Sequence, residues 1–113
     1  MVFGLERIKF LESKWMDIAR LVLTNARKFA NVKEAVIFGS VIKGKAMGAS
    51  DLDIALVVKE LKEEEISNLL ISVHMSLPEE ISEIIDIKFV DEKDEEDFLR
   101  VIGKYVIIKN SKT

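Results

Sequence analysis

The sequence predicts an α/β (α+β) fold in which helices cover one face of a β-sheet and the other face stays open and acidic. Strand-like apolar runs are separated by longer amphipathic stretches along the chain. Two of these strand-like runs place acidic side chains on one side only, because side chains alternate along a strand. The chain of 113 residues, 49% apolar and 33% charged, suits one globular domain with a single core.

The N-terminal part of the chain predicts a long amphipathic helix over residues 5 to 29, with its end near Asn31. Apolar residues recur there at three- and four-residue steps, and the opposite side is charged. The expected apolar face consists of Ile8, Leu11, Trp15, Ile18, Val22, Ala26 and Phe29.

The rest of the chain predicts four strands and two further helices. Pro78 should stop the first of these helices, and Gly103 should end the second. The expected strands cover residues 35–38, 52–58, 84–90 and 105–108, the helices residues 60–77 and 91–102, with a short helix or turn at 41–45 and a frayed end at 110–113.

The second and third strands carry the acidic side chains that matter for function. Asp51 and Asp53 face away from the apolar side of the second strand, and Asp86 faces away from that of the third. If the two strands are neighbours, these three carboxylates lie together. An isolated carboxylate is costly to bury, so the arrangement predicts a site for a divalent cation.

A Gly-Ser pair, Gly39-Ser40, follows the first strand and offers backbone N–H groups to a phosphate. A short basic segment with Lys43 and Lys45 comes next. Residues 39–53 therefore supply both halves of a metal–nucleotide site.

Gly39-Ser40, a spacer from Val41 to Ser50, and the Asp51-x-Asp53 acids resemble the signature of the DNA polymerase beta-type nucleotidyltransferase superfamily. At this size the chain is most similar to the minimal nucleotidyltransferases of prokaryotes, over residues 36 to 90. The resemblance implies a nucleotidyltransferase-type mixed β-sheet. It also implies one domain over residues 1–113, with the N-terminal helix at 5–30 and the catalytic core at 34–108.

The same resemblance implies Mg²⁺-dependent transfer of a nucleoside monophosphate, AMP from ATP or another nucleoside triphosphate, to a hydroxyl acceptor. Asp51 and Asp53 would hold two magnesium ions, and Asp86 would complete the second site and help deprotonate the acceptor. Lys43 stands where arginine is common in the family, which removes a bidentate phosphate contact. The implied nucleotide-binding residues are Gly39, Ser40, Lys43 and Ser50.

Minimal nucleotidyltransferases often pair with a small all-helical toxin of the higher eukaryote and prokaryote nucleotide-binding type. The resemblance thus implies an antitoxin that can adenylylate a tyrosine of its toxin. The N-terminal helix is a candidate contact surface, and a homodimer through it is equally compatible. A catalytically silent antitoxin that acts by binding is one alternative. A small-molecule (antibiotic) nucleotidyltransferase is another, which the lack of a second domain disfavours.

Composition excludes several other classes. A net charge of −3 argues against a general nucleic-acid binder, and the absence of cysteine excludes thiolate metal sites. No apolar run approaches the roughly 20 residues needed to cross a bilayer, and the N-terminus lacks the apolar core of a signal peptide. The sequence predicts a cytoplasmic protein without a membrane partner.

Overall fold

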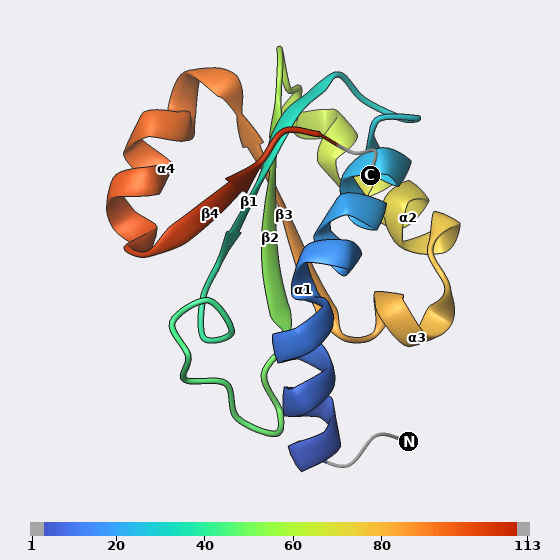
Figure 1. Ribbon diagram of the computed structural model, residues 1–113. Helices are drawn as coiled ribbons and strands as arrows, with labels where there is room; N and C mark the ends of the chain where they lie inside the picture. The colour runs from blue at the N-terminus through green and yellow to red at the C-terminus, as the bar shows by residue number, and fades with distance from the viewer. Residues whose placement is uncertain (1–3, 111–113) are drawn as a thin grey trace.

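The structure, a computed structural model, describes residues 4–110, which fold as helices around one four-stranded sheet (Figure 1). The elements in chain order are α1 (Gly4–Ala26), β1 (Val32–Phe38), β2 (Leu52–Val58), the 3₁₀ turn η1 (Glu63–Glu65), α2 (Ile66–Ser76), α3 (Glu79–Ser82), β3 (Ile85–Asp91), the 3₁₀ turn η2 (Glu92–Asp94), α4 (Glu95–Ile102) and β4 (Tyr105–Ile108).

The sheet is mixed, with the strand order β3-β2-β1-β4. β1 runs antiparallel to both β2 and β4, whereas β2 and β3 are parallel. A parallel pair needs a crossover connection, which the segment with η1, α2 and α3 provides. Leu52 pairs with Ile85 and Val58 with Asp91, so β2 and β3 stay in register along their full length. The predicted fold class is confirmed.

One face of the sheet carries the main core. Alternate side chains of β2 and β3, among them Ile54 and Ile87, pack there with buried residues of α1 and α2 such as Leu11 and Val73. Leu11, Ile54 and Val73 are fully buried. Figure 1 shows α1, α2 and α3 together on this side of the sheet. The predicted apolar face of the strands is therefore the face that takes these helices.

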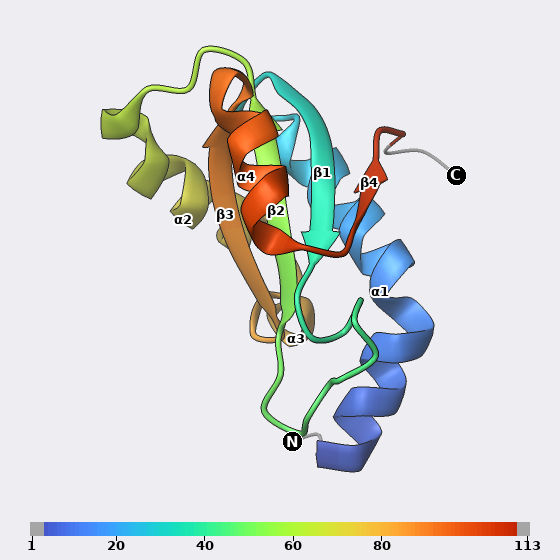
Figure 2. The ribbon, with the colours of Figure 1, turned by 90° about the vertical axis from the view of Figure 1, so that its left-hand side faces the viewer.

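The opposite face is less open than the sequence predicts, because α4 packs across it (Figures 1 and 2). Val36, Ala55 and Val57 form a second, smaller core there with side chains of α4. The rings of Phe38 and Phe98 meet edge to face with 5.4 Å between their centroids. Strand alternation does not predict this cover, since an amphipathic helix can dock on either face of a sheet.

α1 ends at Ala26, before the predicted end. The Lys28 N–H donates to the Asn25 carbonyl at 3.1 Å, an i→i+3 bond that tightens the last turn. The Arg27 Nε then donates to the Val32 carbonyl at 3.0 Å. These bonds turn the chain directly into β1, which begins at Val32 rather than at residue 35.

The helix predicted over residues 60–77 is also shorter in the structure. Glu60 adopts a φ of 56°, and the Asp91 carboxylate accepts the Leu61 N–H at 2.7 Å, so the chain turns before η1 and α2. Asp91 ends β3, which lies one residue later than predicted, and α4 starts only after η2.

The remaining predicted boundaries agree with the structure. β2 and β4 have the expected bounds, and residues 41–44 form a turn, one of the two expected alternatives. Pro78 and Gly103 follow their helices as predicted. Residues 111–113 of the expected frayed end lie outside the described residues.

A buried pair of carboxyl groups joins β1 to α4. Glu34 is 2% exposed and Glu95 is 9% exposed. Burial, and then the hydrogen bond to Glu95 and its charge, raise the pKa of Glu34 to about 7. The hydrogen bond from Glu34 lowers the pKa of Glu95. Lys33 Nζ donates to Glu95 Oε1 at 3.0 Å. Below a pH of about 7, Glu34 therefore carries the proton that the pair shares.

We expect the free energy of unfolding to fall as the pH rises from about 4.5 to above 7. Glu34 binds its proton more tightly in the folded chain, so its contribution is complete below the ordinary pKa of 4.5 and is lost as the pH passes about 7. The slope is at most about 1.4 kcal/mol per pH unit. We would measure the free energy of unfolding with urea across this pH range. Its dependence on pH should be flatter for Glu34→Gln than for the wild type, and the exposed Glu96→Gln is the control. An equally steep curve for Glu34→Gln would contradict the shared proton.

Candidate active site

Two of the predicted acids lie side by side where β2 and β3 begin. Asp53 of β2 pairs in register with Asp86 of β3. The next pair in the register, Ile54 and Ile87, lies in the main core, so both carboxylates project from the opposite face. Neighbouring strands are about 4.8 Å apart, and the two side chains are close enough to share a hydrogen bond. The structure thus brings Asp53 and Asp86 together.

This pair carries more negative charge than its surroundings neutralise. Burial, followed by the charge of Asp86, raises the pKa of Asp53, and the charge of Asp51 adds to the rise. Lys88 opposes it and lies 3.4 Å from Asp86 Oδ2, but both of those side chains are about half exposed, which weakens the ion pair. A cation placed between the two aspartates would relieve the repulsion between them.

Gly39 lies directly against the Asp53 carboxylate. Its neighbour Phe38 pairs with Asp53 across the β1–β2 ladder, and Gly39 itself has a φ of +84°. A β-carbon placed on Gly39 would overlap Asp53 Oδ2. Only glycine therefore combines the left-handed backbone with this close approach. The Gly-Ser turn and the Asp53–Asp86 pair form one continuous site.

The other predicted nucleotide-binding residues lie on the loop between β1 and β2. The Gly39 carbonyl accepts the Lys43 N–H at 3.1 Å, and the Ser40 carbonyl accepts the Lys45 N–H at 2.9 Å, which closes the turn. The Lys43 side chain is exposed and extends toward the end of α4 near Gly103. The hydroxyl of the fourth predicted residue, Ser50, accepts the Met47 N–H at 2.8 Å and so stabilises the loop itself.

Asp51 pairs with a residue that the sequence did not single out. Arg7, near the start of α1, forms an ion pair with Asp51 Oδ1. The Arg7 Nε also donates to the Ser50 carbonyl at 3.1 Å. Asp51 acts on Asp53 through its charge alone, whereas Asp86 acts through a hydrogen bond as well. The predicted trio is therefore a close pair with a third acid bound to α1.

The residues near the pair fit a hard divalent cation in their chemistry. Carboxylate oxygens are the ligands that Mg²⁺ prefers. Because Gly39 has no side chain, it leaves free the space that the Asp53 carboxylate occupies. Within residues 4–110, however, no three acidic or histidine side chains are grouped closely enough to hold a metal ion as they stand. Asp53 and Asp86 would hold the cation, and Asp51 would have to leave Arg7 to join them.

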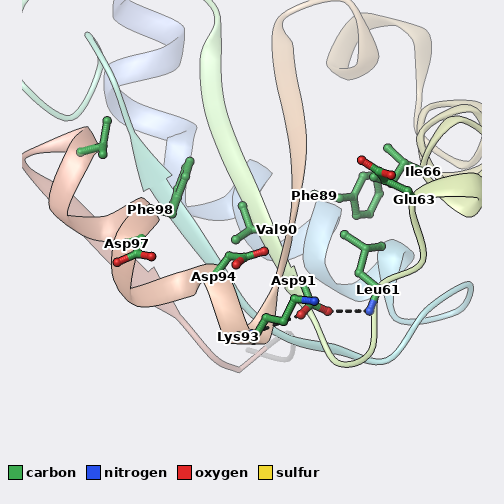
Figure 3. Close-up of a pocket in the computed structure, with 11 residues that line it drawn as sticks. Leu61, Glu63, Ile66, Phe89, Val90, Asp91, Lys93, Asp94, Asp97 and Phe98 are labelled. Atoms are coloured by element: carbon green, nitrogen blue, oxygen red, sulfur yellow. Dashed lines mark hydrogen bonds between the residues drawn. The ribbon is translucent and has the colours of Figure 1, made fainter.

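A separate groove of about 750 Å³ lies at the other end of β3, between α2 and α4 (Figure 3). It begins at Phe89, three residues after Asp86, and extends beyond Asp91. Two of its acids have local partners: Asp91 accepts the backbone N–H groups of Leu61 and Lys93, and Asp97 pairs with Arg100. Figure 3 shows the bond from Leu61 to Asp91 among the residues that line the groove. The groove is therefore distinct from the Asp53–Asp86 site.

The structure places a Gly-Ser turn beside paired acids on a mixed sheet. Residues 22–113 match the family model described as polymerase beta, nucleotidyltransferase. The chain belongs to this nucleotidyltransferase family. The match includes Gly39, Asp53 and Asp86 within its span.

The fold is also similar to a crystal structure of a candidate nucleotidyltransferase from Sulfolobus solfataricus. The two share 22% sequence identity with a TM-score of 0.65, over 89% of this chain and 85% of the other. At this identity the likeness concerns the fold. No curated protein matches the chain significantly. Among the described residues, no helix is long and apolar enough to span a membrane.

Gly39→Ala should destabilise the protein more than Gly44→Ala. Both glycines have positive φ, so each alanine costs about 1–2 kcal/mol in backbone strain. A β-carbon has nothing within 4 Å at Gly44 but meets the Asp53 carboxylate at Gly39, which should add about 1–3 kcal/mol of overpacking. Urea unfolding measures the difference. The additional destabilisation at Gly39 should be smaller when Gly39→Ala is made in an Asp53→Ala background. Equal losses of unfolding free energy for Gly39→Ala and Gly44→Ala would contradict the close approach.

Proposed function

We propose that this protein is a Mg²⁺-dependent nucleotidyltransferase that transfers a nucleoside monophosphate, AMP from ATP in the simplest case, to a hydroxyl acceptor. The observation that carries the proposal is the in-register Asp53–Asp86 pair beside the left-handed Gly39 turn. Membership of the family supports the class of reaction. The elevated pKa of Asp53 supports a cation at the pair, because it reflects a partly buried carboxylate that is further repelled by Asp86.

In this reaction the acceptor oxygen bonds to the α-phosphorus, the bond to the β-phosphate oxygen breaks, and pyrophosphate leaves. Asp53 and Asp86, joined by Asp51, would hold two magnesium ions, which neutralise charge on the triphosphate and on the leaving group. Asp86, whose side chain is about half exposed, would accept the proton of the acceptor hydroxyl. Gly39 and Ser40 would bind the β- and γ-phosphates through backbone N–H groups and the serine hydroxyl.

Lys43 and Ser50 of the loop would assist nucleotide binding without holding the cation. Lys43 would contribute charge to the triphosphate as a flexible point charge, without the bidentate geometry of arginine. Ser50 would act by keeping the loop closed through its bond to Met47, in line with the contact it makes. Both side chains lie on the segment that joins the Gly-Ser turn to Asp51.

We further propose that the acceptor belongs to a protein partner, a small all-helical toxin that this chain neutralises as its antitoxin. The resemblance to minimal nucleotidyltransferases supports this role. α1 supports it as a contact surface, because its apolar residues Phe10, Met16 and Leu21 are 37–41% exposed. The same surface would serve a homodimer. A catalytically silent antitoxin and a small-molecule nucleotidyltransferase are the alternatives, which the experiments below separate.

With α-labelled ATP and magnesium, we expect label on a co-purifying partner or a supplied acceptor. Asp53→Asn should reduce transfer by about 100-fold or more, because a metal ligand contributes several kcal/mol to the transition state. The matched control is Asp94→Asn, which removes the same charge at an exposed position of η2. Equal transfer by the wild type and Asp53→Asn would exclude the proposed site.

The alternatives predict different results in the same assay. A silent antitoxin would leave no label, and its wild-type and Asp53→Asn forms would bind and neutralise the partner equally well. A small-molecule enzyme would label a compound from an aminoglycoside panel rather than a protein. We expect neutralisation by the wild type and its loss in Asp53→Asn, measured as growth of cells that express the partner.

A further inference from the structure

The contact between α1 and the loop before β2 joins the helix to the third predicted acid. Arg7 reaches this loop from a helix 44 residues away in sequence and contacts two consecutive residues. Its Nε donates to the Ser50 carbonyl, and its terminal nitrogen pairs with the carboxylate of Asp51. The Arg7 side chain is 21% exposed and that of Asp51 is 43% exposed. The Arg7 side chain is therefore partly buried between the helix and the loop.

We propose that Arg7 is a positioning residue that holds Asp51 away from the Asp53–Asp86 pair and that a divalent cation must displace it to complete the site. This inference rests on the proposed function, since it concerns the same cation. Asp51 shares an ion pair with Arg7 but acts on Asp53 only through its charge. In keeping with this, no three acidic or histidine side chains within residues 4–110 are grouped closely enough to hold a metal ion.

Electrostatics explains why Arg7 and the cation should compete. Both are positive and both are attracted to the Asp51 carboxylate, so binding of one weakens binding of the other. The ion pair is partly exposed, which keeps its strength moderate and allows exchange. The second bond of Arg7, to the Ser50 carbonyl, restrains the backbone next to Asp51. Release of Arg7 therefore frees both the carboxylate and the end of the loop.

The competition links α1 to the site. Arg7 lies near the start of the same helix whose Phe10 and Met16 are partly exposed. A partner that contacts this part of α1 would change the position of Arg7 and with it the affinity of the site for its cation. Cation loading is then sensitive to what binds the helix, although α1 contributes no ligand itself.

Titration calorimetry of the whole chain with Mn²⁺ tests the proposal without a nucleotide or an acceptor. Arg7→Ala should bind Mn²⁺ roughly two- to five-fold more tightly than the wild type, the range expected for loss of a partly exposed ion pair. Arg7→Lys, which keeps the charge but not the two-nitrogen contact, should fall between them. A gain in affinity separates competition from damage to the fold, which could only weaken binding.

Two controls isolate the contact. Lys9→Ala removes the same charge from an exposed position of α1 and should leave the Mn²⁺ affinity unchanged. In an Asp51→Asn background, Arg7→Ala should no longer tighten Mn²⁺ binding, because the carboxylate for which Arg7 and the cation compete is gone. The double-mutant cycle then measures the coupling between the two residues.

The remaining outcomes overturn the proposal in distinguishable ways. Unchanged or weaker Mn²⁺ binding by Arg7→Ala would show that Arg7 does not compete, or that it orients Asp51 as a ligand, and the proposed function would stand. An equal gain in Mn²⁺ affinity in Lys9→Ala would show that the effect comes from the net charge of the protein and not from the Arg7–Asp51 contact. No Mn²⁺ binding by the wild type would remove both this inference and the magnesium site on which the proposed function depends.

Discussion

The parallel, in-register pairing of β2 with β3 sets the positions of both the core side chains and the acids of these strands. Its register is fixed on one face by apolar side chains such as Ile54 and Ile87, which are buried under α1 and α2. A slip of one residue would send those side chains to the opposite face of the sheet and the acids into the main core. The stability of the core therefore fixes the position of Asp53 beside Asp86. The chemistry of the site follows from packing on the opposite side of the sheet.

The pairing of β2 with β3 determines the surroundings of Asp53. The register places Asp53 in a partly buried position beside a second carboxylate, and burial and then repulsion raise its pKa. Gly39 can pack against Asp53 because it has no side chain, so the turn that would bind phosphates sits within reach of the acids. Arg7 neutralises the third acid from a different element. The site thus combines one strand pair, one glycine turn and one helix.

The sequence predicts the strand pair well and the helix contact not at all. The alternation of residues 52–58 and of residues 85–89 is a local pattern, and it suffices to place Asp53 and Asp86 on one face of the sheet. The Leu61–Asp91 contact that delays α2 joins residues 30 positions apart, which no local pattern connects. Arg7 lies 44 residues from Asp51 and looks like any other charge on an amphipathic helix. Its role depends on where α1 crosses the sheet, which is set by tertiary packing.

The α4 side of the sheet carries a second acid pair, and the contrast between the two pairs explains which one is suited to function. Glu34 and Glu95 are almost fully buried, and their repulsion is resolved within the protein by a shared proton and Lys33. Asp53 and Asp86 have a glycine turn beside them, and the lysine that opposes their charge is about half exposed. Repulsion at the first pair is balanced internally and serves the fold. Repulsion at the second is balanced only in part, and an accessible, incompletely neutralised pair is what a cation site requires.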